Sequence, residues 1–567
     1  MASSVPSSSL ALERIYHWER MSPDKVAWTQ PVGGGALREF TWKDVGDQAR
    51  RMAAHLQSLG VRRGDKVAIL SKNCAWWILS DIAIWMAGGV SVPLYPTLSQ
   101  GTVSQILAHS EARAIFVGKL DEWDAMRPGV PADMPRISYP LSPSDVLADE
   151  QAQWEAIVAR TAPIAGNPVR GADELASIIY TSGTTGTPKG VMQSFGNFAW
   201  GIDAGLRRVS IDARGRMLSY LPLAHVAERM LVEHGQFASG MHVYFAESLD
   251  TFARDLQRAR PTVFFSVPRL WLKFQQGIFA HMPPQRLDRL LKVPLAGRLV
   301  RRKILKALGL DVCQYAAVGA APMPPDLSRW YARLGLDVME VYGLTENCAI
   351  SHATSPGTHR PGTVGLPFDG VQARIDPTSG EIQVLNGCTM LGYYKQPELT
   401  AATFTEDGWL RTGDKGVIDA DGYLRITGRV KDMFKTSKGK YVSPAPIEDR
   451  LVGHPAIEAC CVVGSNFPQP FALVMLNAEA AARTRDARAR AQLEDSLGNH
   501  LLMVNQPLDP HEQLELIVVM TEPWTVDNGL ITPTFKVKRN EIEARFGRQF
   551  GVWAGDKERV VWAPAGQ

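Results

Sequence analysis

Short apolar runs alternate with helical patterns over residues 44 to 120. "DVGDQARRMAAHLQSLG" has the period of an amphipathic helix, and "KVAILS" and "ARAIFVG" have the length and composition of buried strands. The alternation returns between residues 170 and 350, where "PTVFFSV", "CQYAAVG" and "DVMEVYG" are further strand candidates. Strands that alternate with helices form parallel sheets covered by helices, so this pattern predicts an α/β fold.

The pattern changes in the last third of the chain. From about residue 363 to 428, short strands with frequent glycines, such as "GEIQVLNG" and "DGYLRITG", predict a small β subdomain. After "GRVKD", the stretch "APIEDRLVGHPAIEACCVVG" predicts a helix followed by a strand. Because 567 residues exceed one ordinary core, we predict a large N-terminal domain of α/β subdomains plus the β subdomain over residues 1–430, and a small α+β domain over residues 431–567.

Composition excludes several classes of protein. The chain has 61 basic and 58 acidic residues, and a net charge of +3 is too small to indicate a nucleic-acid partner. Six cysteines without a C-x-x-C pair predict neither a zinc site nor a disulfide framework, which suits a reducing cytoplasm. No secretory signal is evident at the start of the chain. The apolar stretch at 76–95 is interrupted by Asp81 and by Gly88-Gly89, so we expect a core helix that turns into a strand.

Residues 180 to 190, "YTSGTTGTPKG", have the composition of a phosphate-binding loop. Glycines let backbone amides approach closely, hydroxyls donate hydrogen bonds and Lys189 supplies a compact cation. A Walker loop ends in Gly-Lys-Ser/Thr, whereas this stretch ends in Pro-Lys-Gly, so a different nucleotide chemistry is needed. A surface linker is the alternative. We expect "LASIIY" before the loop to form a strand and "VMQSFGNFAWGIDAGL" after it to form a helix.

Three further stretches carry candidate site residues. "VYGLTE" ends a strand with a turn, a hydroxyl and the carboxylate Glu346, and "LRTGD" places Asp414 after a glycine turn, where it can accept both ribose hydroxyls. "GRVKDMFKTSKGKYVSP" is rich in cations. Taken singly, each stretch is equally well explained as a capped turn or a solvated loop.

Together these stretches resemble the adenylate-forming superfamily of acyl-CoA synthetases, luciferases and nonribosomal adenylation domains. The resemblance covers roughly residues 40 to 545 and rests on "YTSGTTGTPKG", "YGLTE", "TGD", "GRVKD" and "NGLITPTFKVKR", in the family's order. Within the superfamily, "SYLPLAHVAERM" and "FKTSKGKYVSP" are most similar to the long-chain fatty acyl-CoA synthetase branch. The resemblance implies a two-step reaction in which a fatty acid and MgATP give an acyl-adenylate, and coenzyme A then displaces AMP.

The resemblance also implies roles for individual residues. Those expected to hold the β- and γ-phosphates are Thr181, Ser182, Gly183, Thr184, Thr185 and Lys189. Thr181 and Glu346 are expected at Mg²⁺, and Thr345 at the α-phosphate. Those expected around adenine and ribose are Gly319, Ala320, Ala321, Tyr342, Asp414 and Arg429.

The remaining roles belong to one histidine and three lysines. Lys431 is the expected hinge of a rotating small domain, Lys536 the adenylation lysine and Lys435 a lysine on that domain's opposite face. His225 is expected beside the acyl site, as a wall of the carboxylate pocket. Many relatives carry a further histidine after the phosphate loop, but this chain has Phe195 between Ser194 and Gly196 there, so that residue's role is not carried over.

Several alternatives stay open at this stage. A medium-chain or aryl-CoA ligase, or an enzyme that loads a separate carrier protein, has the same motifs, and a degenerate relative would act as a scaffold. Residues 296–309, "AGRLVRRKILKALG", form a candidate cationic amphipathic helix that either docks on anionic lipid or packs as a solvated helix. Acyl length, the identity of the CoA-binding residues and oligomeric state are left open by the sequence.

Overall fold

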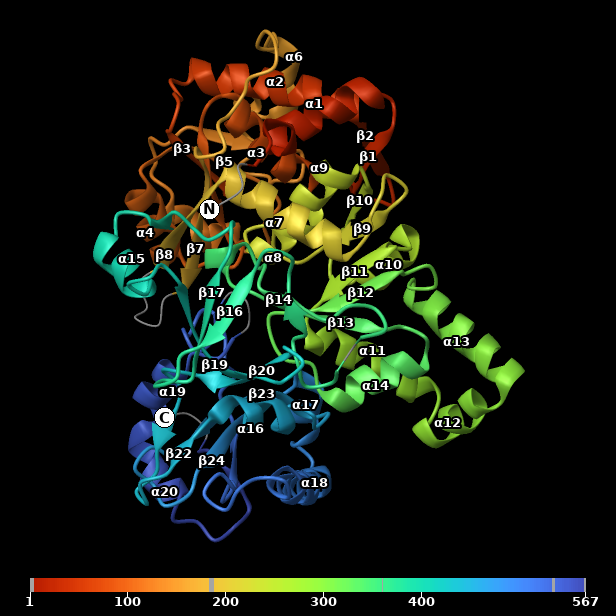
Figure 1. The fold of residues 1–567 in the computed structure, drawn as a ribbon, viewed down its shortest axis with the longest axis vertical. Coiled ribbons are helices and arrows are strands. Elements are labelled where there is room, and N and C mark those ends of the chain that lie inside the picture. The colour runs from red at the N-terminus through yellow and green to blue at the C-terminus, as the bar shows by residue number, and fades with distance from the viewer. Residues whose placement is uncertain (1–4, 183–187, 359, 533–535, 565–567) are drawn as a thin grey trace. The chain divides into compact units, whose positions relative to one another are not determined.

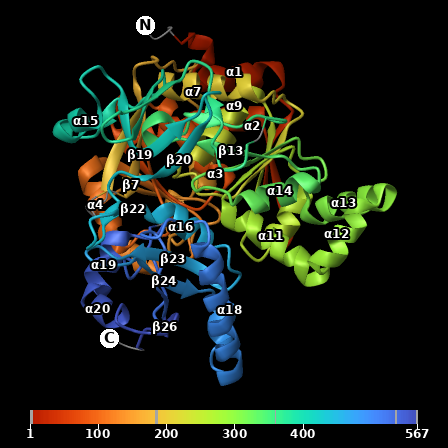
Figure 2. The same ribbon diagram turned by 60° about the horizontal axis from the view of Figure 1, so that its bottom comes forward.

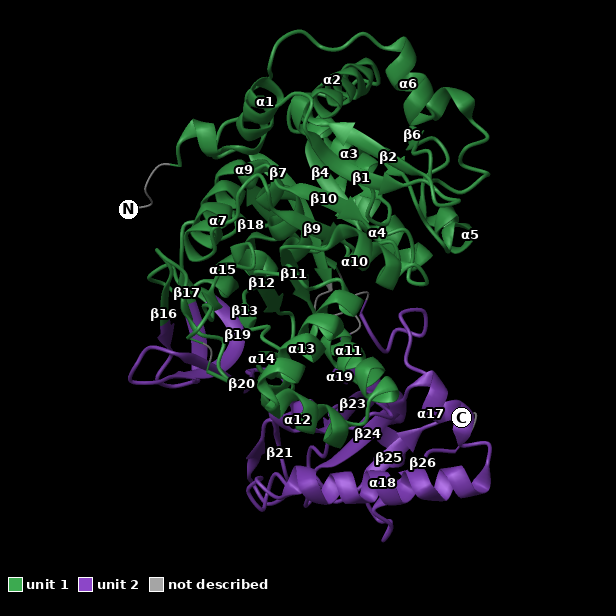
Figure 3. Cartoon of the chain, turned by 90° about the vertical axis from the view of Figure 1, so that its right-hand side faces the viewer, with its two compact units in different colours: residues 1–373, 384–410 green, residues 374–383, 411–567 purple. Residues whose placement is uncertain are grey.

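The computed structural model describes residues 5–182, 188–358, 360–532 and 536–564. Figure 1 shows a mixed α/β molecule, as the alternating pattern predicts. Its residues divide into two compact units, residues 1–373 with 384–410 and residues 374–383 with 411–567, coloured green and purple in Figure 3. The boundary expected after residue 430 stays a prediction.

The first unit contains a seven-stranded sheet. The strands follow the order β18 (Gly392–Tyr393), β8 (Pro188–Ser194), β7 (Leu175–Ser182), β4 (Val90–Leu94), β3 (Lys66–Leu70), β5 (Ala112–Val117) and β6 (Arg136–Ser138). The pairs from β7 to β6 are parallel, whereas β8 and β18 add to the sheet antiparallel. The predicted parallel sheet is therefore confirmed for five strands and carries an antiparallel extension.

Helices of the alternating segment accompany this sheet. They are α2 (Trp42–Ser58), α3 (Ala75–Met86) and α4 (Gln100–Ser110). Every residue of α3 is buried, including three tryptophans, because apolar side chains surround the helix and its one charged residue, Asp81, pairs with the buried Arg229. The expected core helix that turns into strand β4 is confirmed. No helix among the described residues is both long enough and apolar enough to cross a membrane.

The segment after the phosphate loop differs from its prediction. A helix was expected over "VMQSFGNFAWGIDAGL", but residues up to Ser194 form strand β8, and the helix α7 (Phe195–Arg208) begins only there. The backbone of "VMQS" pairs with β7 across the hairpin, so ladder hydrogen bonds replace helical ones. Ser194 then caps the helix, since its hydroxyl accepts a hydrogen bond from the Asn197 amide.

Two more sheets complete the first unit. One has the order β2 (Leu37–Thr41), β1 (Val26–Pro31), β10 (His242–Phe245) and β9 (Arg216–Ser219). The other has the order β11 (Val263–Ser266), β12 (Tyr315–Val318), β13 (Val338–Tyr342), β14 (His352–Ala353) and β15 (Leu366–Pro367). The helices that follow or join these strands are α1 (Ala11–Met21), α8 (Val226–Glu228), α9 (Gly235–Ser239), α10 (Phe252–Ala259), α11 (Pro268–His281), α12 (Pro284–Lys292), α13 (Pro294–Leu308) and α14 (Pro325–Arg333).

The second unit is built from smaller sheets. The predicted β subdomain is the sheet β16 (Gln372–Ile375), β17 (Glu381–Leu385), β19 (Leu410–Ile418) and β20 (Leu424–Arg429), of which residues 374–383 and 411–429 belong to this unit. The hairpin β21 (Phe434–Lys435) and β22 (Tyr441–Val442) follows. The predicted helix and strand are α16 (Pro444–Leu451) and β23 (Ile457–Val463), in a four-stranded sheet with β24 (Phe471–Leu476), β25 (Ile517–Met520) and β26 (Val560–Trp562). Helices α18 (Ala487–Asn505) and α19 (Arg539–Phe546) belong to the same α+β part (Figure 2).

Candidate active site

The ends of the phosphate-loop motif lie on two paired strands. Thr181 and Ser182 are the last residues of β7, and Lys189 is the second residue of β8. Thr181 lies opposite Lys189 in the antiparallel register, so the hydroxyl-bearing and cationic ends of the motif are neighbours. The other predicted phosphate ligands, Gly183, Thr184 and Thr185, lie outside the described residues.

Glu346 lies beside the same strands. It belongs to a short 3₁₀ turn, Thr345–Asn347, whose backbone is fixed on two sides. The Gln193 side chain of β8 donates to the carbonyl of Thr345 at 2.7 Å, and the Met390 amide donates to the carbonyl of Glu346 at 2.7 Å. The half-buried Glu346 carboxylate is thus held against β8 by backbone contacts of its own turn.

Tyr393 joins Lys189 to Glu346. Its hydroxyl donates a hydrogen bond to Glu346 Oε1 at 2.8 Å, and the Lys189 Nζ lies 5.5 Å from the centre of its ring. Tyr393 is placed there because β18 pairs with β8, with Tyr393 opposite Val191. Burial, followed by the charge and hydrogen bond of Glu346, raises the pKa of Tyr393, so the phenol stays a protonated donor at neutral pH.

Sequence reasoning missed Tyr393. The signal was the "GYYKQP" stretch, in which a glycine and two aromatic residues precede a turn. That stretch is far from both motifs along the chain, and only the pairing of β18 with β8 brings the hydroxyl to Glu346. Such a contact has no periodic pattern in a single sequence.

The donor set at Glu346 fits a magnesium ion that is bound mainly by nucleotide phosphates. Mg²⁺ commonly takes one or two carboxylates and completes its shell with phosphate oxygens and water, without a cage of protein ligands. The residues described here contain no cluster of three or more His, Cys, Asp or Glu side chains with metal-site geometry. Tyr393 orients Glu346 Oε1, while Oε2 forms no hydrogen bond with another residue that the structure describes. Glu346 is therefore suited to supply a single ligand to a MgATP complex.

The residues predicted around adenine gather at one edge of the second parallel sheet. β12 and β13 run parallel, with Val318 opposite Glu340. Gly319 to Ala321 follow the carboxyl end of β12, and Tyr342 is the last residue of β13. This is the edge at which open α/β sheets bind ligands. Ala320 has a positive φ of 66°, and both Ala320 and Ala321 are exposed, whereas Tyr342 is buried.

His225 lies at the start of helix α8. It is half-buried, and its Nδ1 accepts a hydrogen bond from the Ala227 amide at 3.2 Å, so the ring caps the helix. Three residues further on, the buried Glu228 carboxyl accepts hydrogen bonds from Ser219 and from the Tyr220 amide, both at 3.0 Å. Burial raises the pKa of Glu228 to about 8.

The ribose residues form an ion pair in the second unit. Asp414 lies opposite Arg429 in the β19–β20 ladder, and Arg429 Nε is 3.1 Å from Asp414 Oδ1. Asp414 is 9% exposed, while Arg429 is exposed. Gly413 provides the turn before Asp414, with a φ of 73° that glycine adopts without strain.

The three lysines predicted for the site in the second unit are all exposed. Lys431 follows strand β20, and Lys435 lies on β21 with its Nζ 5.7 Å from the Tyr441 ring. Lys536 is tied by its backbone, which exchanges hydrogen bonds with the backbone and hydroxyl of Thr532. The structure thus brings Lys189, Glu346 and Tyr393 together in one unit and Asp414 and Arg429 together in the other.

Comparison with known proteins agrees with this arrangement. A family model described as "AMP-binding enzyme" matches residues 15–394, and one described as "AMP-binding enzyme C-terminal domain" matches residues 431–550. The adenylation domain of a carboxylate reductase from Mycobacterium chelonae has the same fold, with a TM-score of 0.80, 24% identity, and coverage of 97% of this chain and 93% of that one.

Two relatives match over almost the full length at higher identity. Long-chain-fatty-acid–CoA ligase FadD15 of Mycobacterium bovis is 32% identical, with coverage of 94% of this chain and 95% of the relative. Long chain acyl-CoA synthetase 7, peroxisomal, of Arabidopsis thaliana is 30% identical, with coverage of 94% and 84%. With its five motifs in order and both family models matched, the chain belongs to the AMP-binding enzymes of the adenylate-forming superfamily.

Proposed function

We propose that the protein is an ATP-dependent, AMP-forming ligase that joins long-chain fatty acids to coenzyme A. The observation that carries the proposal is the cluster of Lys189, Tyr393 and Glu346 beside the ends of the phosphate-loop motif. In this cluster, Lys189 offers a cation to phosphate oxygens, and Glu346 offers an oriented carboxylate to the Mg²⁺ ion that accompanies the phosphates. The substrate class is supported by the relatives, which are named as long-chain acyl-CoA ligases.

The reaction has two balanced steps. In the first, a fatty-acid carboxylate oxygen attacks the α-phosphorus of ATP, the bond to the bridging oxygen breaks, and pyrophosphate leaves. In the second, the coenzyme A thiol loses its proton and attacks the acyl carbon, and the bond to AMP breaks. A carboxylate is a poor electrophile, and AMP gives it a good leaving group, so the protein has to position the reactants and neutralise charge.

Within the proposal, the residues of the first unit bind the triphosphate and the acid. Lys189 and the Thr181 hydroxyl bind the β- and γ-phosphates, and Glu346 holds Mg²⁺, which neutralises phosphate charge when bound. Thr345 contacts the α-phosphate, while Gly319 to Ala321 and Tyr342 flank adenine. His225 forms a wall of the carboxylate pocket, because the acid is already ionised at neutral pH and needs no base.

The residues of the second unit bind ribose and supply mobile cations. Asp414 accepts hydrogen bonds from the ribose hydroxyls, and Arg429 keeps its carboxylate oriented. Lys431 is the proposed hinge of a rotating small domain, Lys536 acts in adenylation, and Lys435 acts in thioester formation.

A cytoplasmic location is also part of the proposal. All six cysteines are free thiols, including the adjacent Cys460 and Cys461, which suits a reducing compartment. The near-neutral net charge supports no nucleic-acid partner.

The test is pyrophosphate exchange with a panel of acids, followed by capture of the thioester. We expect exchange and CoA-thioester formation to be highest for long-chain acids. If pyrophosphate exchange and thioester formation were highest for medium-chain or aromatic acids, the protein would be a medium-chain or aryl-CoA ligase. Transfer of the acyl group to a carrier protein but not to coenzyme A would mean that the thiol acceptor is a carrier protein. Failure of the folded protein to bind ATP would indicate a scaffold.

A further inference from the structure

Helix α13 and the last turn of α12 carry a dense positive charge. The segment from Arg289 to Gly309 has seven basic residues and no acidic residue. The seven are Arg289, Lys292, Arg298, Arg301, Arg302, Lys303 and Lys306. All seven side chains are exposed, and none forms a side-chain hydrogen bond or ion pair with another residue that the structure describes. Their charge is therefore available to an external anion.

The apolar residues of α13 divide into two groups. Val300, Ile304, Leu305 and Leu308 are partly buried and pack on the core of the second parallel sheet. This stripe accounts for ordinary packing of the helix. Leu295 and Leu299 do not belong to it, and they are 79% and 69% exposed. Val293, in the turn between α12 and α13, is 51% exposed.

Exposed leucines and cations share one face of α13. Leu295, Leu299, Arg302 and Lys306 follow the helical spacing of four, three and four residues, with Arg298 and Lys303 on either side. We call these six residues the outer face of α13. A helix that is only solvated gains nothing from leucines on its outer face, so their position among cations points to a partner.

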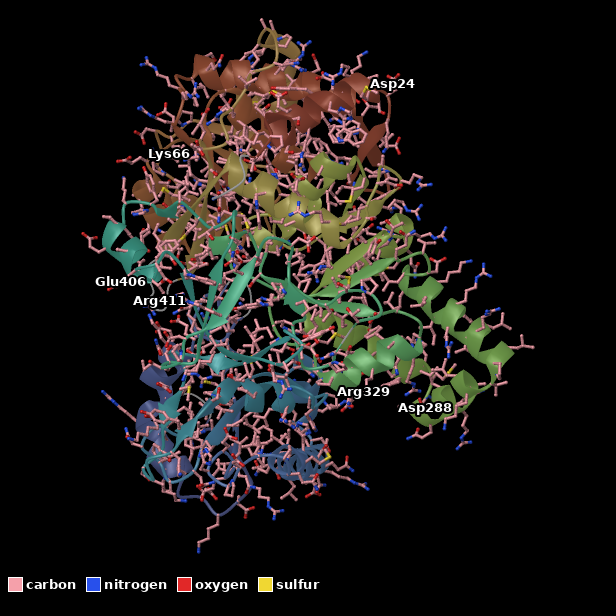
Figure 4. All side chains as sticks on the ribbon, in the orientation of Figure 1. Asp24, Lys66, Asp288, Arg329, Glu406 and Arg411 are labelled. Atoms are coloured by element: carbon pink, nitrogen blue, oxygen red, sulfur yellow. The ribbon has the colours of Figure 1, made fainter. Side chains whose placement is uncertain are left out.

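The pair of helices also extends from the body of the first unit. In Figures 1 and 2 α12 and α13 run outward from the sheet of β11, β12 and β13, and the turn that joins them lies at their outer end. Gly309 packs closely on Leu256 of α10 at the other end of α13, and Arg333 of α14 pairs with Asp288 of α12, which is labelled in Figure 4. The helices are thus fixed at their base and exposed at their tip.

We propose that the outer face of α13 and the α12–α13 turn dock on the surface of an anionic lipid bilayer. Lysine and arginine side chains bind anionic head groups, and leucine and valine side chains enter the boundary between head groups and acyl chains. Nucleic acid would pair with the cations but leave the leucines in water. The proposal does not depend on the ligase reaction, although a long-chain acid partitions into the same bilayer.

Helix α18 in the second unit is an internal contrast. It also has exposed apolar residues, Leu502 at 46% and Met503 at 61%. Its charges, however, are mixed, and Arg490 forms an ion pair with Glu494 at 3.1 Å. An exposed apolar side chain alone is ordinary, whereas α13 combines it with a face that has cations and no acid.

The test is co-sedimentation of the full chain with vesicles, without ATP or fatty acid. One set of vesicles contains phosphatidylglycerol and phosphatidylcholine in equal amounts, and the other phosphatidylcholine alone. We expect binding to the first set only, weakened by salt. Arg298→Gln with Arg302→Gln and Lys303→Gln should lower the bound-to-free ratio about 100-fold, or roughly fivefold per cation, at low ionic strength.

The matched control removes three exposed cations elsewhere, Arg20→Gln with Lys43→Gln and Arg62→Gln, and should bind like wild type. Leu295→Ser with Leu299→Ser keeps every charge and should also weaken binding. Wild-type binding by the charge variant would overturn the proposal. Equal binding to both vesicle sets would also overturn it. Full binding by the leucine variant would overturn it too, because it would indicate a purely ionic surface. The ligase activity of each variant is also measured on a water-soluble acid. Weaker vesicle binding with unchanged activity would then be a loss of docking, separate from any failure of the proposed reaction.

Discussion

The two units hold their candidate carboxylates in different ways. Glu346 of the first unit accepts a hydrogen bond from a neutral phenol, that of Tyr393, and has no cation paired with it in the residues described. Asp414 of the second unit is paired with the guanidinium of Arg429 at 3.1 Å. Glu346 therefore presents a carboxylate without a paired cation to a ligand, whereas the Asp414 carboxylate already has the Arg429 guanidinium beside it.

This difference suits two kinds of ligand. A carboxylate with uncompensated charge is suited to a cation such as Mg²⁺. A carboxylate paired with arginine still has lone pairs to accept hydrogen bonds, and the neutral hydroxyls of ribose need no further charge. The proposed roles of metal ligand and ribose ligand follow from these surroundings as well as from the family motifs.

The largest expected effect concerns two exposed cations of the second unit, Lys536 and Lys435, in contrast to the carboxylates Glu346 and Asp414. Lys536→Ala should slow acyl-adenylate formation about 1000-fold, because its cation is needed where negative charge gathers during attack on the α-phosphate. The variant should still convert a supplied acyl-adenylate to acyl-CoA. Lys435→Ala should slow thioester formation more than adenylation.

Pyrophosphate release and acyl-CoA formation, followed separately, measure these two steps. Lys438→Ala, which removes a third exposed lysine of the same unit, is the control and should slow neither. An equal loss in both steps for Lys536→Ala, with the fold intact, would contradict the rotating-domain mechanism.

The next effect tests the metal side of the comparison. Glu346→Gln keeps the side-chain volume and removes the charge, so adenylation at limiting magnesium should fall roughly 100-fold or more. Raising magnesium should recover part of the rate. Adenylation rates measured over a magnesium titration check this, and a wild-type titration curve would remove Glu346 from the metal site.

Asp414→Asn tests the ribose side and serves as the contrast to Glu346→Gln. Loss of charge-assisted hydrogen bonds to the ribose hydroxyls should raise the KM for ATP about 30-fold. Its magnesium dependence should match that of wild type, because the metal does not bind there. If both variants shifted the magnesium titration equally, the two carboxylates would have the same role and the comparison would fail.

The fold was more accessible from the sequence than the site. The strand candidates "KVAILS", "PTVFFSV" and "DVMEVYG" became β3, β11 and β13, because apolar runs between helices have few alternatives in an α/β chain. The part of β8 from Val191 to Ser194 was wrongly expected to be helical, because its pairing with β7 depends on the partner strand and not on local periodicity. Tyr393 was missed for the same kind of reason, since its partner Glu346 is 47 residues away along the chain.

Tyr393→Phe gives a smaller effect that sharpens the account of Glu346. It removes one hydrogen bond and leaves the ring beside Lys189, so adenylation at limiting magnesium should fall about fivefold. The magnesium titration should shift in the same direction as in Glu346→Gln. Tyr394→Phe is the matched control, because the Tyr394 ring packs edge-on against His109, 5.7 Å away. An unchanged titration for Tyr393→Phe would show that the phenol does not orient the carboxylate.

The smallest effect on activity comes from a third carboxyl, Glu228. Like Glu346 it accepts hydrogen bonds from neutral groups, but it is buried. Burial raises its pKa from 4.5 to about 8, so the folded protein keeps the proton between these values while the unfolded chain loses it. The unfolded state then binds fewer protons, and the free energy of unfolding contributed by this group falls as the pH rises from about 4.5 to about 8. Glu228 is thus unsuited to bind a cation at neutral pH.

Glu228→Gln should remove that part of the pH dependence, because glutamine keeps an oxygen to accept from Ser219 and the Tyr220 amide but does not titrate. Thermal unfolding of variant and wild type across this pH range gives the difference, which should grow in favour of the variant as the pH rises. Glu406→Gln, at an exposed glutamate labelled in Figure 4, should show no such trend. The magnesium titration of Glu228→Gln should be that of wild type. A constant stability difference at all pH values would mean that Glu228 is ionised in the folded protein, and exposure would then not be what separates it from Glu346.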